Sequence, residues 1–379
     1  MLRKTIIMKL LYFICLSYLF CSISHAQALA KNVFIITLDG VRWQEIFKGA
    51  DSALIRNEAY VQDTTLMLQQ FWDNTPQARR QKLLPFFWSV LSKHGSLMGN
   101  RDLKNKVNVD NLYKISYPGY NEIFTGYADK IFIPNLALSN PNNNVLSFLN
   151  NKEEFAGNVA AFCSWRMLPF ILNEKNSSLP VNAGYEALSE SDSTNIFINN
   201  IQKNSAPAGS TRHDLLTFEA ARNYIEMHHP RVLYLGLGET DEFAHHGEYD
   251  LYLQKLHQAD AMIAELWYLV QTNPLYKNNT SFIITTDHGR GRRANNWNTH
   301  GFWISGSGET WLAMIGNGIA PVGEQYVNQQ LYQKQIAATI AQLLGYEFYA
   351  NHPVAKPIPL LPASKINNAV ETTSTAKGF

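Results

Sequence analysis

The feature that most constrains the fold is a set of five short apolar runs, most of which end in polar or charged residues. The runs are 33–38 (VFIITL), 159–163, 232–237, 281–286 and 311–315. Continuous apolar runs of this length are typical of strands that are covered on both faces of a parallel sheet. Segments with apolar residues at helical spacing alternate with them, and these are 213–228, 249–271 and 329–344. The pattern predicts an α/β fold with three layers, in which helices flank a mainly parallel central sheet.

The N-terminus has the pattern of a signal peptide over residues 1–26. Basic residues lie in the first nine positions, an apolar stretch follows over 10–21, and Ser24 and Ala26 place small residues where a signal peptidase reads them. The apolar stretch is short for a membrane span, although an uncleaved anchor is the alternative. We therefore predict a secreted or periplasmic protein with no membrane span after cleavage.

Residues 27–362 are expected to form a single catalytic domain, and residues 363–379 a flexible tail. Residues 42–110 and 129–215 contain much sequence outside the apolar runs, so we expect cap insertions there that shape a cleft. Removal of residues 1–26 leaves Cys163 as the only cysteine; it lies in an apolar run and is expected to be a buried strand residue.

The charge of the chain argues against a nucleic-acid partner. The full sequence has a formal net charge of +1, and without residues 1–26 it holds 29 Lys+Arg against 31 Asp+Glu. No run of Lys or Arg is present that could follow a phosphate backbone. We expect a small-molecule substrate, and the sequence does not indicate the oligomeric state.

Acidic and imidazole side chains lie at three of the predicted strand ends and in one later loop, which holds His300. The set is Asp39, Asp241, His245, Asp287, His288 and His300. In open α/β sheets, ligands bind beyond the carboxyl ends of the strands. Aspartate and histidine together suit zinc or a similar divalent ion, and six ligands are too many for one tetrahedral site. The sequence therefore predicts two divalent metal ions, with Zn²⁺ favoured, although each residue taken singly could be a turn or surface residue.

Ser116 is a candidate nucleophile. It precedes Tyr117 and Pro118, and serine followed by a proline in the first turn predicts a helix N-cap. Backbone N–H groups at such a position point at an anion, and a metal bound to the hydroxyl would lower its pKa toward neutrality. A plain N-cap with no chemical role is the alternative.

Five segments together resemble the alkaline phosphatase superfamily, in particular its nucleotide pyrophosphatase/phosphodiesterase-like and periplasmic alkaline phosphatase branches. They are ITLDGVRW (36–43), KISYPGYNEIFTGY (114–127), GETDEFAHHG (238–247), TTDHGRG (285–291) and NTHGFW (298–303). Their order and spread match the metal-site elements of that superfamily, and the resemblance extends over residues 31–347. It implies an alkaline-phosphatase-like fold.

The resemblance also implies a role for each site residue. One zinc would be held by Asp39, Asp287, His288 and the nucleophile Ser116. The other would be held by Asp241, His245 and His300. Phosphate esters would then be cleaved through a phosphoserine intermediate on Ser116. The alternatives left open are a phosphodiesterase or nucleotide pyrophosphatase, and a sulfate or phosphonate ester hydrolase, acting at the same site.

Two further positions come from the resemblance. The periplasmic phosphatase branch has a Lys-x-Arg pair after a middle strand; this chain has Ser164 and Arg166 there, so Arg166 is a candidate phosphate clamp. The diesterase branch has an asparagine that contacts phosphate. Its candidates here are Asn135, Asn140 and Asn142–Asn144.

Two negative expectations complete the analysis. Sulfatases of the superfamily modify a C/S-x-P-x-R motif, and because Tyr120 stands at its last position, a formylglycine sulfatase is not expected. Arg290, Arg292 and Arg293 follow the predicted metal motif, and we expect them to be solvated loop residues.

Overall fold

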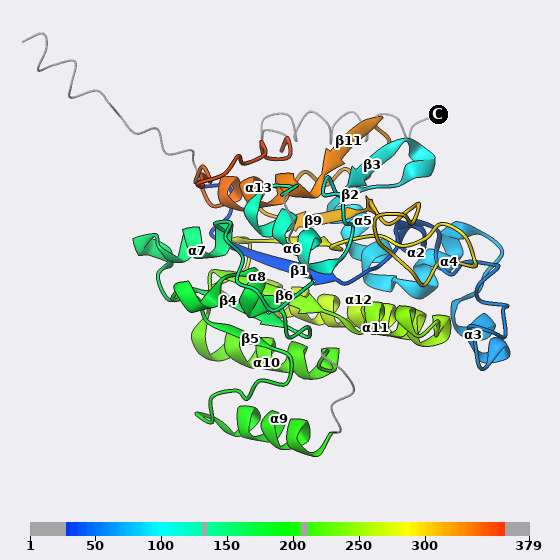
Figure 1. Ribbon diagram of the computed structural model, residues 1–379, viewed down its shortest axis with the longest axis horizontal. Coiled ribbons are helices and arrows are strands. Elements are labelled where there is room, and N and C mark those ends of the chain that lie inside the picture. The colour runs from blue at the N-terminus through cyan, green and yellow to red at the C-terminus, as the bar shows by residue number, and fades with distance from the viewer. Residues whose placement is uncertain (1–27, 131–134, 206–210, 361–379) are drawn as a thin grey trace, which may run out of the picture.

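A twisted central sheet organises the chain (Figure 1). The structure is a computed structural model that describes residues 28–130, 135–205 and 211–360. The predicted signal peptide (1–26) and tail (363–379) lie outside the described residues. Within the described residues, no helix is both long and apolar enough to cross a membrane.

The main sheet has eight strands. In spatial order they are β10 (Gly323–Glu324), β2 (Gly95–Met98), β9 (Leu312–Gly316), β7 (Thr280–Thr285), β1 (Asn32–Leu38), β6 (Val232–Leu237), β4 (Val159–Cys163) and β5 (Val181–Ala183). Strands β7, β1, β6, β4 and β5 pair in parallel, whereas β9 runs antiparallel to β7 and β2. The mainly parallel sheet is therefore confirmed, and the five predicted strands correspond to β1, β4, β6, β7 and β9.

Successive residues of β1 face two different cores, which is why its sequence shows no alternation. Phe34 and Ile36 lie in one hydrophobic cluster, and Val33 and Ile35 lie in the other. Both faces of the strand exclude water, so both sets of side chains must be apolar. The predicted three-layer arrangement is confirmed, because α10 and α12 pack in one hydrophobic cluster and α6 and α13 in the other.

Helices cover both faces of the sheet. One face is covered by α2 (Trp43–Lys48), α3 (Thr64–Phe71), α4 (Pro76–Leu83), the π-helix η1 (Phe87–Leu91), α9 (Ser193–Asn204), α10 (Asp214–His228), α11 (Glu239–His245) and α12 (Tyr249–Thr272). The other face is covered by α6 (Ser116–Thr125), α7 (Val145–Asn150), η3 (Glu153–Phe155), α8 (Leu168–Ile171) and α13 (Ile336–Leu343). Shorter turns are α5 (Ser92–His94), η2 (Arg101–Leu103), η4 (Glu174–Asn176) and η5 (Gln333–Gln335).

The helix predicted over 329–344 is only half correct. Its first four residues form strand β11 (Gln329–Tyr332), which pairs in parallel with β3 (Asn105–Asn108). Strand β3 also pairs with β8 (Glu309–Thr310), so the three form a second small sheet. The pairing partner of β11 is more than 200 residues away in the sequence, and such a non-local contact overrides the local helical spacing. Helix α13 begins at Ile336 after one 3-10 turn.

The segment 42–110 is more than an insertion over the sheet. It contributes α2 to α5, but also β2, which extends the main sheet, and β3 of the small sheet. Cys163 is buried in β4 and is a free thiol, as expected.

Helix α6 packs closely against the residue that follows the end of β7. A Cβ atom at Gly119 would lie 2.3 Å from the carbonyl oxygen of Asp287. Only glycine allows this approach, so the helix and the strand end are fixed relative to one another by a residue without a side chain.

We predict that Gly119→Ala lowers the free energy of unfolding. Alanine in an unobstructed helix would stabilise it by about 1 kcal/mol, but overpacking costs about 1–3 kcal/mol, so the net effect is a loss. Urea unfolding measures it. Gly308→Ala is the matched control, because a Cβ there would lie 3.4 Å from its nearest neighbour, an ordinary contact. A gain in stability for Gly119→Ala would contradict the packing described here.

Candidate metal centre

Three neighbouring strand ends bring together carboxylates that lie far apart in the sequence. Strand β1 lies between β7 and β6 and runs parallel to both. Asp39 follows β1 directly, Asp287 follows β7 after one threonine, and Asp241 lies in the first turn of α11 after β6. Because parallel strands end at the same edge of a sheet, the three aspartates gather there.

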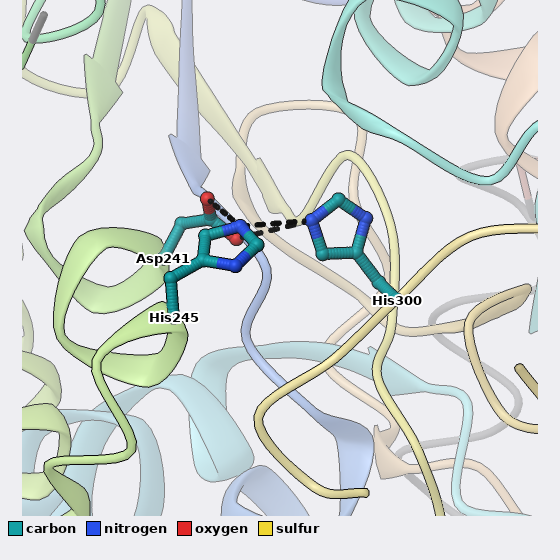
Figure 2. Close-up of side chains that lie close together, drawn as sticks. All are labelled: Asp241, His245 and His300. Carbon is teal, nitrogen blue, oxygen red and sulfur yellow. Dashed lines mark hydrogen bonds and ion pairs between the residues drawn. The ribbon is translucent and has the colours of Figure 1, made fainter.

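Asp241, His245 and His300 form the first group, and their side chains face one another (Figure 2). One turn of α11 separates Asp241 from His245, whose Nε2 lies 3.1 Å from the Asp241 Oδ2 and 3.0 Å from the His300 Nε2. The His300 Nδ1–H donates to the carbonyl of Lys114, at 3.3 Å, so its Nε2 carries a lone pair. Two ring nitrogens this close require a proton or a cation, and Asp, His and His are a ligand set that zinc favours.

Asp39, Asp287 and His288 form the second group and are buried. The His288 Nδ1–H donates to the carbonyl of Gly289, at 3.0 Å, so its Nε2 is free to act as a ligand. That Nε2 lies 3.6 Å from the Asp39 Oδ1 and 3.4 Å from the Asp287 Oδ2. These two oxygens are buried and have no hydrogen-bond partner. Unpartnered buried carboxylate oxygens are costly, so the group fits a bound cation.

The pKa shifts of these residues have burial as their main cause. Burial raises the pKa of Asp39 to about 8, and the charge of Asp287 adds to the shift. Burial likewise raises the pKa of Asp287 to about 7. Burial also lowers the pKa of His288 and, together with the charge of His288, that of His300. The histidines are therefore held neutral, the form that binds metal, while the aspartates need a cation to ionise fully.

Asp241 links the two groups. The ligand atoms of Asp241, His245 and His300 all lie within 4.8 Å of one another, and so do those of Asp39, Asp241 and His288. The first set is the predicted triad. In the second, Asp241 takes the place that the resemblance gives to Asp287, and its Oδ1 lies 3.8 Å from the His288 Nε2. The assignment of individual ligands to each metal stays a prediction.

Ser116 lies beside the second group. Its Oγ is 3.2 Å from the His288 Nε2. The N-cap prediction is wrong by one position, because the helix begins at Ser116 and Ile115 is the cap. The reason is that the Gly119 N–H donates to the Ile115 carbonyl, at 3.0 Å, which makes Ile115 the first acceptor of the helix. The Ser116 side chain is thereby left free to face the metal cluster.

A polar cavity of about 200 Å³ opens beside these side chains. It is lined by Asp39, Ser116, Asn135, Trp165, Thr211, Gly238, Asp241, Glu242, His245 and His300. Three of these residues, Asn135, Trp165 and Thr211, come from the segment 129–215 in which cap insertions were expected.

The cavity distinguishes between the asparagine candidates. Asn135 lines it and accepts a hydrogen bond from the Tyr117 N–H at 2.8 Å. Asn140 and Asn142 instead donate to the side chain of Asn121, and Asn144 caps α7. Asn143 interacts with residues near the C-terminal end of the described chain. Asn135 is thus the candidate beside Ser116.

Arg166 is exposed and does not line the cavity as the side chains are placed. Its clamp role stays a prediction. Ser164, at the position of the family's lysine, is buried, and its hydroxyl donates to the Asp214 Oδ1 at 2.6 Å. Asp214 also accepts hydrogen bonds from the Gly238 N–H at 2.7 Å and the Glu239 N–H at 3.1 Å. Ser164 and Asp214 therefore hold the turn that starts α11, the helix of Asp241 and His245.

Sequence reasoning missed the role of Arg290. It was expected to be a solvated loop residue together with Arg292 and Arg293; Arg292 and Arg293 are exposed, but Arg290 is buried. Its guanidinium forms an ion pair with the Asp241 carboxylate and donates to the carbonyls of Gly40, at 3.0 Å, and Asn298, at 2.7 Å. Arg290 is therefore a cation built into the cluster. Its position directly after Asp287-His288-Gly289 was the available signal.

Two hydroxyl groups also support Asp39. The Tyr120 hydroxyl donates to its Oδ2 at 2.9 Å, and the Thr240 hydroxyl donates to its carbonyl at 2.7 Å. Gly40 adopts a φ of 62°, and a Cβ there would lie 2.5 Å from the Asp241 Oδ1. The turn after β1 therefore needs glycine for both its conformation and its space.

Comparison with known proteins agrees with this picture. A family model described as the metalloenzyme superfamily matches residues 182–347. Wild-type alkaline phosphatase PafA is similar in structure, with a TM-score of 0.57 and 11% identity over 87% of this chain and 98% of that chain. A phosphonate monoester hydrolase of Agrobacterium radiobacter has a TM-score of 0.51 and 12% identity, covering 83% of this chain and 74% of its own. The 2-O GAG sulfatase BT1596 has a TM-score of 0.54 and 12% identity, covering 86% of this chain and 73% of its own.

The search of curated proteins gives no significant match. The structural neighbours nevertheless show that the chain shares the fold of alkaline phosphatase PafA and of the phosphonate monoester hydrolase, and the metalloenzyme model matches less than half of the chain. The chain has an alkaline-phosphatase-like fold, and its matched region contains Asp241, His245, Asp287, His288 and His300. The names of the similar structures describe a phosphatase, a phosphonate monoester hydrolase and a sulfatase.

The raised aspartate pKa values predict how metal-free protein responds to pH. Asp39 and Asp287 bind protons more tightly when folded than when unfolded, so their contribution to stability is complete below about pH 4 and is lost as pH rises through 7 to 8. We expect metal-stripped protein to have a lower free energy of unfolding at pH 8 than at pH 5.5. Added Zn²⁺ should stabilise it most at pH 8. Metal-free stability that rises over this range would contradict the assignment.

Removing Arg290 should destabilise the protein. Arg290→Met leaves the Asp241 carboxylate without its cation, and breaking a largely buried ion pair on one side costs about 3 kcal/mol. Urea unfolding of metal-stripped protein measures the loss. Arg293→Met is the control, since Arg293 is exposed in the same loop, and a change within about 0.5 kcal/mol is expected there. Equal effects of the two substitutions would contradict the role given to Arg290.

Proposed function

We propose that this chain is a secreted or periplasmic two-metal phosphohydrolase that cleaves phosphate esters with Ser116 as its nucleophile. The observation that carries the proposal is the position of the Ser116 hydroxyl, 3.2 Å from the His288 Nε2 and beside two buried aspartates with unpartnered oxygens. The signal-peptide pattern of residues 1–26 supports the location.

The charge of the cluster supports the requirement for two divalent ions. Asp39, Asp241 and Asp287, when ionised, carry three negative charges, and Arg290 returns one positive charge. An anionic ester would be repelled by this site. Two divalent cations would reverse the net charge, and the six predicted ligands with Ser116 suffice for two sites.

The reaction proposed for Ser116 is in-line phosphoryl transfer. The bound metal ions supply positive charge that lowers the pKa of the serine hydroxyl and stabilises charge on the departing oxygen. The deprotonated Ser116 oxygen forms a bond to phosphorus while the ester P–O bond breaks and the alcohol leaves. A water molecule then attacks phosphorus, the bond to Ser116 breaks, and serine and free phosphate are restored.

A phosphodiester is the second candidate substrate, and one observation favours it. No Lys or Arg lines the cavity in the described part of the chain, whereas Asn135 offers a neutral amide beside Ser116. A diester carries one negative charge less than a monoester, so it needs fewer cationic side chains to offset its charge. The names of the similar structures, which include a phosphatase, a phosphonate monoester hydrolase and a sulfatase, leave phosphonate and sulfate esters as further alternatives.

The proposal predicts the behaviour of Ser116 variants toward two chromogenic esters. With zinc-loaded protein, p-nitrophenyl phosphate and bis-p-nitrophenyl phosphate are compared directly. Ser116→Ala should lower kcat by about 10³-fold or more on the preferred ester, because the attacking oxygen is lost. Ser116→Thr keeps a hydroxyl group and should retain measurable activity. Chelation should abolish activity in all of them.

The outcomes separate the alternatives. Preference for the monoester supports the phosphatase reading and a role for Arg166. Preference for the diester moves the substrate class to phosphodiesters and supports Asn135. Full activity of Ser116→Ala would contradict the nucleophile assignment, and activity on neither ester by metal-loaded protein would contradict the substrate class.

A further inference from the structure

The largest of the described cavities lies away from the metal centre. Its volume is about 670 Å³, against about 200 Å³ beside Ser116, and the two cavities share no lining residue. It is formed by α2 and the loop after it, by β3 of the small sheet, and by the loop that leads from Arg290 to β8. A volume of this size can hold a ligand of drug-like dimensions.

The charge of this cavity is strongly unbalanced. Five cationic residues line it, and they are Lys48, Arg79, Arg101, Lys106 and Arg292. Only two carboxylates, Asp51 and Glu309, line it with them. The lining therefore carries an excess of three positive charges, in a chain whose total formal charge is close to zero. The electric potential inside a concave cationic surface is concentrated further by the low-dielectric walls.

The cations are held at the cavity wall by a defined scaffold. Glu309 accepts hydrogen bonds from the Arg292 Nε at 3.0 Å and from the Trp43 indole N–H at 3.2 Å, and its Oε1 lies 3.3 Å from the Arg101 Nε. Arg101 also donates to the carbonyl of Val107 and to the side chain of Asn108, both at 2.8 Å. The Lys48 ammonium lies 4.7 Å from the centre of the Trp43 ring.

Lys106 is the cation best placed to meet a ligand. It is exposed on β3, lines the cavity, and forms no ion pair with any described residue. Glu309 is the carboxylate partner of both Arg101 and Arg292. The Lys48 Nζ lies 2.7 Å from the Asp102 Oδ2. The carboxylates present therefore do not neutralise the wall.

We propose that this cavity binds a small anion that carries two or more phosphoryl groups, at a site separate from the metal centre. Arg101 donates its N–H groups to protein acceptors and supplies charge to the wall. The Lys106 ammonium, the Arg79 Nη2 and the Arg292 Nη1 have no acceptor among the described residues, and N–H donors around a concave wall suit tetrahedral groups with several oxygens. The excess of three charges matches a ligand with more than one phosphoryl group. The Asn108 side chain lines the cavity and accepts hydrogen bonds through its Oδ1, so its amide nitrogen adds a neutral donor. The site makes no use of Ser116 or of the predicted metal ligands.

The test is calorimetric titration with methylenediphosphonate, which carries two phosphonate groups and has no ester bond to cleave. Metal-stripped, full-length protein is used. Without metal ions, the aspartates of the predicted metal centre give it a negative charge that repels the anion. We expect one equivalent to bind, and Lys106→Glu to weaken binding at least tenfold. Lys104→Glu is the matched control, because Lys104 is also exposed, lies two residues away and does not line the cavity. The affinity of the Lys104→Glu variant for methylenediphosphonate should stay within about twofold of that of the unmodified protein.

Three results would overturn the proposal. They are no saturable binding to metal-stripped protein, binding that appears only after zinc is restored, and equal weakening by Lys106→Glu and Lys104→Glu. The second would place the anion on the metal centre, and the third would reduce the effect to general charge attraction. Because the titration does not depend on hydrolysis, failure of the proposed ester hydrolysis would leave its outcome unaffected.

Discussion

The structure depends on the gathering of three carboxylates, two of them buried, at one edge of the sheet. Asp39, Asp241 and Asp287 follow three adjacent parallel strands, so the topology forces them together. Among the described residues, Arg290 is the cation that pairs with this group, and one cation cannot compensate three ionised aspartates. Burial raises the pKa values of Asp39 and Asp287, with the charge of Asp287 adding to the shift at Asp39, and one oxygen of each carboxylate has no hydrogen-bond partner. A site with these properties favours the binding of cations.

The surroundings of the cluster serve the same end. Gly40 and Gly119 leave out side chains where a Cβ would collide with Asp241 or Asp287. Backbone carbonyls accept the Nδ1 hydrogens of His288 and His300, which fixes the Nε2 lone pairs toward the cluster. The fold therefore fixes the orientation of the ligands before any ion binds, and this preorganisation reduces the cost of binding.

The parts of the fold that were predictable from the sequence are those encoded locally. The apolar run of β1 identifies a doubly covered strand by itself. The rule that ligands gather at strand ends pointed to Asp39, Asp241, His245, Asp287 and His288, whereas His300 came from a later loop. Strand β11 was mistaken for a helix because its pairing with β3 depends on residues far away. Arg290 was read as a loop residue, since its position after Asp287-His288-Gly289 places it near the cluster but does not show that its side chain turns inward onto Asp241. The choice of Asn135 over Asn140 likewise required the hydrogen bonds of Asn121.

The central claim is that the two Asp/His groups bind two divalent metal ions beside Ser116. Anomalous X-ray diffraction at the zinc absorption edge, on crystals of zinc-loaded protein, tests it most directly. The account predicts two anomalous peaks, one among Asp241, His245 and His300 and the other among Asp39, Asp287, His288 and the Ser116 oxygen. Zinc-loaded crystals with no peak at these residues, or with zinc bound only elsewhere on the protein, would contradict it.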